Sequence, residues 1–230
     1  PNMYGRCNEL NLFPPEPVTT RTIVIEQLDN VLNLLPTAAV GAPPTLGTQG
    51  KRTVRSFVIP HIPHEDRVYA SDVQGVRAFG SGNTAETVNA VYAKKLETMR
   101  NKHAITLEHL RMGALKGIVL DSDASTIYNY YTEFGISQES QNFALTTTTT
   151  EVIAKVFALK RYMEDNLKGE VMSGVHVFCS SGFFESLVTH TLVKEAYKYF
   201  VTNQQLSQDT RTRFVYGGVT FEEYRGTATD

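Results

Sequence analysis

The sequence predicts an α+β fold, and three observations point to it. Residues 83–116 repeat apolar side chains at helical spacings of three and four without a long interruption. Several short runs rich in β-branched and aromatic residues indicate strands, at 22–25, 54–59, 118–120, 175–178 and 213–221. The elements follow one another as an arm, a long β excursion, a large helix, a hairpin and an α/β region.

The composition describes an ordinary globular chain. The 230 residues are 41% hydrophobic and 20% charged, which fits one or two folded domains. The net charge of -2 gives no global electrostatic reason to bind nucleic acid. Two cysteines far apart suit a reducing, intracellular compartment. No apolar run has the length of a membrane span, and the N-terminus lacks a signal-peptide pattern.

The N-terminal quarter predicts an arm followed by a ribbon. Residues 1–22 are rich in proline and lack periodicity, so we expect an extended arm that buries no face of its own. Residues 23–59 indicate two strands around a Gly/Pro-rich tip at 41–47, and residues 28–35 favour either a brief helix or an irregular apolar patch. A two-stranded ribbon is marginally stable alone, so this one needs a partner surface.

The strongest local signal is a long helix. Asn83 with Glu86 forms a capping-box pattern at its start, and Gly117 is placed to end it. The apolar stripe, which we expect to face a core, is Val88, Val91, Tyr92, Leu96, Met99, His103, Leu107, Leu110 and Ala114. Its basic residues, Lys95 among them, indicate a solvated or partner-facing side. Two helices broken near Lys102 are the alternative.

The C-terminal half predicts a hairpin and then alternating helices and strands. The hairpin pairs 118–120 with 126–131 around a turn at 121–125. A β-prone threonine run at 146–150 precedes a helix at 151–169. A third helix is expected at 183–200, between the strands at 175–178 and 213–216.

Two histidines raise the question of a metal site. His61 and His64 are three residues apart, but Pro60 and Pro63 favour an extended backbone that spreads them along the chain. No motif supplies a third ligand. A rigid structural joint is the favoured interpretation, and we predict neither a metal nor a cofactor.

One segment could carry a nucleophile. Cys179 and Ser181 lie at a predicted strand-to-helix turn, where backbone N–H groups and the helix dipole would help a nucleophile. The G-x-S-x-G pattern is missing and no base is tied to the segment by a motif. A cap for the following helix is the commoner meaning, so the chain is predicted not to be an enzyme.

Four stretches carry a family resemblance. Residues 51–80, from Lys51-Arg52-Thr53 to Phe79-Gly80, are the most specific, and 114–121, 177–184 and 214–221 match as well. Together they resemble the major capsid protein E family of tailed bacteriophages, the lambda type, from about residue 20 to the end. The glycine of the family in the 121–125 turn is replaced here by Ala124 or Ser125.

The resemblance implies the tailed-phage major capsid protein fold. On it, residues 1–22 are the N-terminal arm and 23–82 are the E-loop region, an extended β-hairpin. Residues 83–144 are the peripheral domain with its spine helix and a hairpin, and 145–230 are the α/β axial domain. Because members usually continue with more strands, we expect the axial domain to be incomplete at its C-terminus.

The implied function is a structural one. Copies would assemble into pentamers and hexamers of an icosahedral head around double-stranded DNA, contacted non-specifically, in a virion assembled in the host cytoplasm. Cement or decoration, scaffold and portal proteins are possible partners, and no membrane is involved. Apolar side chains and guanidinium groups mix along the ribbon at Arg52, Arg55, Phe57 and Ile59, which is typical of interfaces. With residues of the matched stretch that follows, the candidate subunit-interface residues are Arg52, Arg55, Phe57, Ile59, His61, His64, Asp66, Arg67 and Arg77.

Two rival functions stay open at this point. A hydrolase would use Cys179 or Ser181 and would react with thiol or serine reagents. A tail or adaptor structural protein of a phage would form rings or tubes, where a capsid protein would form closed shells.

Overall fold

The computed structural model describes residues 5–28, 52–74, 87–167, 171–200, 211 and 213–226. The chain divides into two compact units, residues 15–65 and residues 1–14 together with 66–230. Within the described residues the structure mixes helices and short strands, as the predicted α+β class requires.

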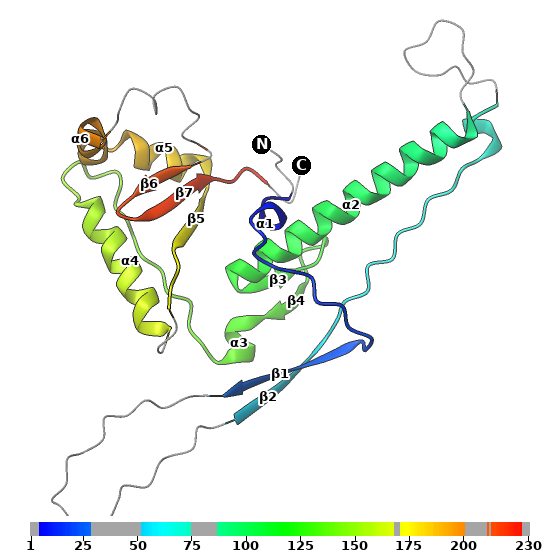
Figure 1. Ribbon diagram of the computed structural model, residues 1–230, viewed down its shortest axis with the longest axis horizontal. Coiled ribbons are helices and arrows are strands. Elements are labelled where there is room, and N and C mark those ends of the chain that lie inside the picture. Colours follow the sequence, from blue (N-terminus) through cyan, green and yellow to red (C-terminus); the bar gives the residue numbers. More distant parts are fainter. Residues whose placement is uncertain are drawn as a thin grey trace, which may run out of the picture. The chain divides into compact units, whose positions relative to one another are not determined.

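The smaller unit contains the predicted ribbon. Strand β1 (Thr22–Leu28) pairs antiparallel with β2 (Arg52–Val58), in a register that places Ile23 opposite Phe57 and Glu26 opposite Val54 (Figure 1). The two strands are therefore confirmed. The predicted tip at 41–47 and the segment 28–35 fall mostly outside the described residues, as does Arg77.

The N-terminal arm differs from its prediction. A short helix α1 (Arg6–Glu9) forms in it, and the side chain of Cys7 is completely buried. The expectation that this arm buries no face of its own is therefore wrong. Proline content predicted extended chain for the whole arm, but the prolines that follow Pro1 begin only at Pro14, after the helix.

The long helix α2 (Val88–Lys116) is one continuous element of 29 residues, about 44 Å long at about 1.5 Å per residue. The alternative of two helices is thus excluded. The helix begins later than predicted, because Thr87 rather than Asn83 is its N-cap and accepts from the Ala90 N–H. Its end at Gly117 is confirmed: this glycine has φ +85, a conformation that favours glycine.

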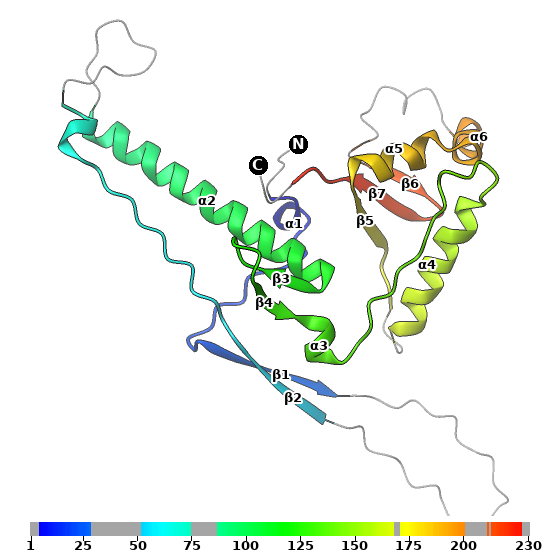
Figure 2. The same cartoon turned by 180° about the vertical axis from the view of Figure 1, so that it is seen from behind.

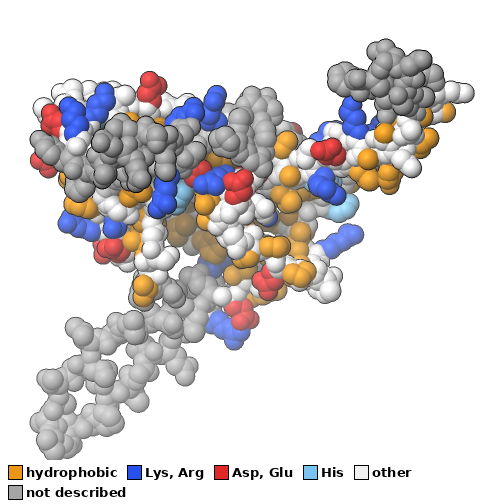
Figure 3. Space-filling model, turned by 45° about the horizontal axis from the view of Figure 1, so that its top comes forward, with side chains coloured by type: hydrophobic (Ala, Val, Ile, Leu, Met, Phe, Trp, Pro, Cys, Tyr) orange, Lys and Arg blue, Asp and Glu red, His pale blue; other side chains and the backbone are white. Residues whose placement is uncertain are grey.

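The apolar stripe of α2 is less buried than predicted. Val88, Tyr92, Leu96 and Leu107 are all exposed, and the one buried residue of the helix is Glu108. Figure 3 shows hydrophobic side chains at the surface of the part of the molecule that α2 forms. The other members of the predicted stripe are half-buried, so the face is covered only in part by the described residues: Val91, Met99, His103, Leu110 and Ala114.

A hairpin follows the long helix, as predicted. Strands β3 (Ile118–Leu120) and β4 (Thr126–Asn129) pair antiparallel. Ala124 in their turn has φ +65, which is a position suited to glycine. The second strand ends sooner than predicted, because the Asn129 side chain accepts from Tyr131 and Thr132 N–H groups and starts helix α3 (Tyr130–Phe134).

The C-terminal part is a sheet with helices packed on one face. Strand β5 (Val175–Cys179) is parallel to β7 (Val219–Glu223), and β6 (Phe214–Tyr216) is antiparallel to β7. Helices α4 (Val152–Asn166), α5 (Ser181–Thr189) and α6 (Thr191–Phe200) are grouped around it in Figure 1. They bury one core, made of Val152, Val156, Val175, Cys179, Phe184, Leu187, Val193, Phe214, Val219 and Phe221.

Two predictions for this part were wrong. The single helix at 183–200 is two helices, because His190 takes an extended backbone conformation between α5 and α6. The β-prone run at 146–150 forms turns instead of a strand. The Thr150 hydroxyl donates to the Ala144 carbonyl, and the buried His190 places Nε2 3.0 Å from the Thr147 carbonyl oxygen. The first hydrogen bond is local, whereas His190 is 43 residues from Thr147, so a local and a tertiary contact together hold this run as turns.

Candidate subunit interface

One face of the ribbon carries a row of exposed side chains. In β2 the side chains alternate, so that Arg52, Val54, Ser56 and Val58 are exposed while the residues between them are at least half-buried. Val24 on β1 belongs to the same exposed face, because it pairs with Ser56. The three valines are 57–60% exposed, and they share this face with the charged Arg52 and Glu26, so the face mixes apolar and charged side chains.

The predicted interface residues of the ribbon fall on both faces. Arg52 is exposed and forms an ion pair with Glu26 across the ribbon. Arg55 and the buried Phe57 lie on the opposite face. Ile59 follows β2, exposes 40% of its surface and donates its N–H to the Arg21 carbonyl at 2.8 Å. The face that the valines form was missed, because the sequence does not say which side a ribbon leaves bare.

His61 and His64 lie in an irregular segment after the ribbon. His61 is exposed and His64 is half-buried. Across the described parts of the chain, no group of three or more His, Cys, Asp or Glu side chains is arranged to hold a metal ion. The structural-joint interpretation stays a prediction.

Asp66 and Arg67 belong to the larger unit, where they meet a lysine that the sequence predicts on a solvated or partner-facing side of α2. The Lys95 ammonium lies 3.5 Å from Asp66, 3.2 Å from Asp72, and donates to the Arg67 carbonyl oxygen. The hydrogen bond with Asp72 raises the pKa of Lys95. The Tyr69 N–H and then Lys95 lower the pKa of Asp72. Lys95 thus fastens the segment 66–72 to α2.

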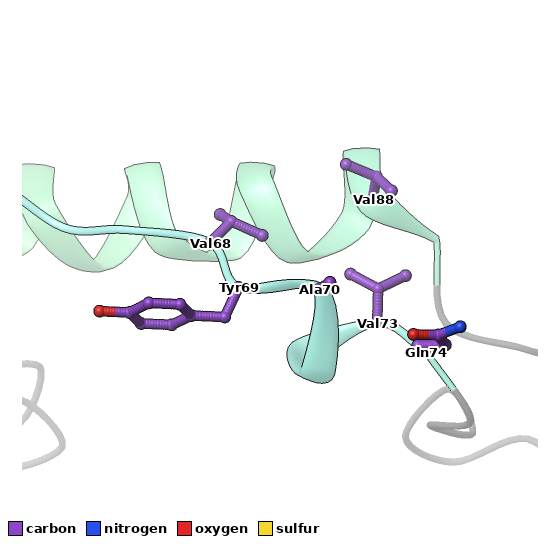
Figure 4. Close-up of a pocket in the computed structure, with 6 residues that line it drawn as sticks. All are labelled: Val68, Tyr69, Ala70, Val73, Gln74 and Val88. Atoms are coloured by element: carbon purple, nitrogen blue, oxygen red, sulfur yellow. The ribbon is translucent and has the colours of Figure 1, made fainter.

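An open apolar pocket of about 420 Å³ lies at the start of α2. Ala70, the first residue of the short 3-10 helix η1 (Ala70–Asp72), lines the pocket, and Figure 4 shows Val73 pointing toward Val88. Tyr69 and Val88 are about 60% exposed. The pocket holds apolar side chains and one amide, Gln74, so it offers a contact surface rather than reactive groups.

The candidate nucleophile segment is a helix cap. The Ser180 hydroxyl accepts from the Phe183 N–H at 3.4 Å and starts α5, while Ser181 is the first residue of that helix. Cys179 is buried, and this burial raises the pKa of its thiol to about 11. At neutral pH the group is a protonated core thiol, and a thiolate nucleophile is disfavoured there. The expected meaning of this segment as a cap is confirmed.

In the described part of the chain, every helix is too short or too polar to cross a membrane.

Comparison with known proteins agrees with the resemblance in the sequence. The model of the family "Phage major capsid protein E" matches residues 1–230. The major capsid protein of Pseudomonas phage KPP10 is 32% identical over 241 residues, which cover 98% of this chain and 68% of that protein. The major capsid protein of Salmonella phage Felix O1 (isolate Felix O1-VT1) is 32% identical over 245 residues, covering 98% and 66%. The chain therefore belongs to the phage major capsid protein E family, and it is a structural protein of the virion capsid, not an enzyme.

Proposed function

We propose that copies of this chain form the pentamers and hexamers of an icosahedral phage head that encloses double-stranded DNA. The observation that carries the proposal is the exposure of three valines, Val24, Val54 and Val58, on one face of the ribbon. A two-stranded ribbon alone is marginally stable in water, and its exposed valines and open strand edges favour association. Contact with a neighbouring copy removes this surface from water.

The order of the elements supports the division of the chain that the family resemblance implies. The ribbon β1–β2 lies within 23–82, the proposed E-loop region, apart from the first residue of β1. Helix α2 with the β3–β4 hairpin lies within 83–144, the proposed peripheral domain with its spine helix. Helices α4 to α6 and the β5–β7 sheet lie within 145–230, the proposed axial domain. Residues 1–22 are the proposed N-terminal arm.

The charge of the chain fits a container for DNA. A net charge of -2 leaves little excess of positive side chains to hold phosphates. A strongly basic inner wall would bind DNA tightly and hinder its release. We therefore propose non-specific contact with packaged DNA, with cement, scaffold and portal proteins as further partners.

Negative-stain electron microscopy of purified protein tests the assembly. We expect closed shells, or their pentamers and hexamers, from the unmodified chain when scaffold and partner proteins are supplied. Rings or tubes would indicate an adaptor protein instead. Persistent monomers at high concentration under these conditions would contradict the proposal.

The role of the ribbon face is tested by replacing its three valines with threonine, which keeps their shape and β-propensity. We expect Val24→Thr, Val54→Thr and Val58→Thr together to prevent shells while the circular dichroism stays unchanged. Val171→Thr is the matched control, because Val171 is 94% exposed but lies outside the ribbon. Normal shells from the triple variant would show that the valine face is not an interface.

A further inference from the structure

Helix α1 lies between two parts of the larger unit. Both Figure 1 and Figure 2 show it next to α2 on one side and near the end of β7 on the other. Two consecutive residues of α1 contact different elements: Arg6 contacts β7, and Cys7 contacts α2. A segment of a few residues therefore bridges elements that are more than 100 positions away in the chain.

In the contact with β7, two basic side chains bind one buried carboxylate. Glu222 is 6% exposed, and Arg6 binds both of its oxygens, with Nε at 2.5 Å and Nη2 at 3.0 Å. His176 on β5 places Nε2 3.0 Å from the same carboxylate. Arg6 also pairs with Glu9 of its own helix at 2.9 Å. Glu222 lies on the face of the sheet opposite to Phe221 and the helical core, since successive side chains of a strand alternate.

The contact with α2 is also centred on a buried carboxylate. The Cys7 N–H donates to Glu108 Oε1 at 2.9 Å, and Glu108 is 2% exposed. Cys7 Sγ lies 3.4 Å from Met112 Sδ, one helical turn along α2. The only apolar side chain that this short helix fully buries is Cys7. Leu10 and Phe13 of the same segment are only half-buried. An element with so few fully buried apolar side chains opens more easily than a core element.

The remaining chain connection between these parts is slender. Between the end of α3 at Phe134 and the start of α4 at Val152, residues 135–140 are exposed and have no helix or strand. Such a segment can absorb changes of backbone angle without disturbing packed elements.

From these contacts we propose that residues 5–14 are a releasable brace, which fixes α2 relative to the β5–β7 sheet while Arg6 and Cys7 are docked. When the brace is released, residues 135–140 act as the hinge about which the sheet and its helices turn. The proposal does not depend on how copies of the chain associate, because each contact lies within one chain.

Chemical modification of the two cysteines distinguishes release of the brace from unfolding of the whole chain. Cys7 lies in the brace, whereas Cys179 lies in the core of the sheet, and both are buried. Release exposes Cys7 alone, and global unfolding exposes both. The test measures the rates at which a maleimide modifies each thiol in the full chain, read by peptide mass spectrometry.

Two variants weaken the brace from opposite sides. Arg6→Gln changes a residue of α1, and Glu222→Gln removes the buried charge but keeps the shape. Glu223→Gln is the matched control, because it neutralises the next carboxylate of β7, which lies near Arg225 instead of Arg6. We expect the modification of Cys7 to become about tenfold faster in both brace variants, with Cys179 unchanged.

The motion is tested with spin labels on ketone-bearing residues at Ala104 of α2 and Ala158 of α4, because ketone chemistry leaves the thiols alone. The distance distribution should be narrow in the parent and in Glu223→Gln, and broad in Arg6→Gln. A protected Cys7 in Arg6→Gln, equal exposure of both thiols in that variant, or a distribution as narrow as in the parent overturns the proposal. Should Glu222→Gln fail to fold, Arg6→Gln alone decides, since its side chain is 28% exposed and lies outside the core.

Discussion

The hydroxyl of Tyr131 donates a 2.7 Å hydrogen bond to the carbonyl oxygen of Lys116, the last residue of α2. The ring lies against Gly117, where the Cβ of any other residue would meet Tyr131 Cζ at 2.5 Å. The Tyr130 N–H donates to the Gly117 carbonyl at 2.8 Å. The end of the long helix and the end of the β3–β4 hairpin are therefore locked together at one glycine.

This lock predicts a large effect of Gly117→Ala. The new side chain meets the Tyr131 ring, and alanine at φ +85 is strained in addition. We expect the free energy of unfolding to fall by more than about 2 kcal/mol. Urea unfolding followed by circular dichroism measures it.

Two other glycines separate the effect of backbone strain from the effect of the contact with Tyr131. Gly135 has φ +63 but open space around it, so Gly135→Ala should cost only the strain, about 1 kcal/mol. Gly182 lies in α5 with open space, so Gly182→Ala should be neutral or stabilising by up to about 1 kcal/mol. A loss at Gly117 no larger than at Gly135 would show that the contact with Tyr131 has no energetic weight.

The two buried thiols predict a loss of stability in alkali. Burial raises the pKa of Cys7 to about 12 and of Cys179 to about 11, from 9.0 in the unfolded chain. Above pH 9 the unfolded thiols lose protons that the folded ones keep, so rising pH favours unfolding. Each thiol should lower the unfolding free energy by up to about 1.4 kcal/mol per pH unit.

Urea unfolding at about pH 8, 9 and 10 under reducing conditions measures this slope. The Cys179→Ala variant should lose part of it, and the double variant with Cys7→Ala should lose more. An equal slope in the parent and the double variant would assign the alkaline effect to tyrosines and lysines instead.

The ion pair of Arg52 and Glu26 allows a test of whether Arg52 contributes to assembly. Arg52→Glu sets two carboxylates close together, and the exchange of both charges, Glu26→Arg with Arg52→Glu, restores the pair. An exposed pair contributes at most about 1 kcal/mol within the ribbon. If Arg52 serves a neighbouring copy, the exchange variant should still assemble poorly.

Light scattering against ionic strength measures assembly of both variants. Exposed charges are screened within about 10 Å at about 0.1 M salt, so the defect of Arg52→Glu should change with salt concentration. Full recovery of assembly in the exchange variant would limit Arg52 to a role inside the ribbon.

The long excursion between the two strands predicts a separable role in assembly. Deletion of residues 38–50 should abolish shells, because we expect the ribbon to clasp a neighbouring copy. It should leave the helical circular dichroism intact, since α2 and the α/β part lie in the other unit. Intact shells, or a lost helical signal, would each contradict this assignment.

The sequence determined the elements whose signals are local. The spacing of apolar residues predicted α2, and Gly117 predicted its end, because a helix that stops in a left-handed residue favours glycine. The strands β1, β2, β3 and β5 were predicted from β-branched and aromatic residues. The residues at 51–80 also indicated the family, and the comparison with known capsid proteins confirmed it.

Tertiary structure alone decided where these elements meet. No local pattern distinguishes Lys95, which fastens the segment at Asp66, from the other lysines of α2. None marks Glu222 as the partner of Arg6, 216 residues away. At the break between α5 and α6, the buried His190 contacts the Thr147 carbonyl in the turns at 146–150, 43 residues away in the chain. Contacts of this kind depend on which distant side chains the fold brings within hydrogen-bonding reach, whereas helix and strand signals depend only on neighbours in the chain.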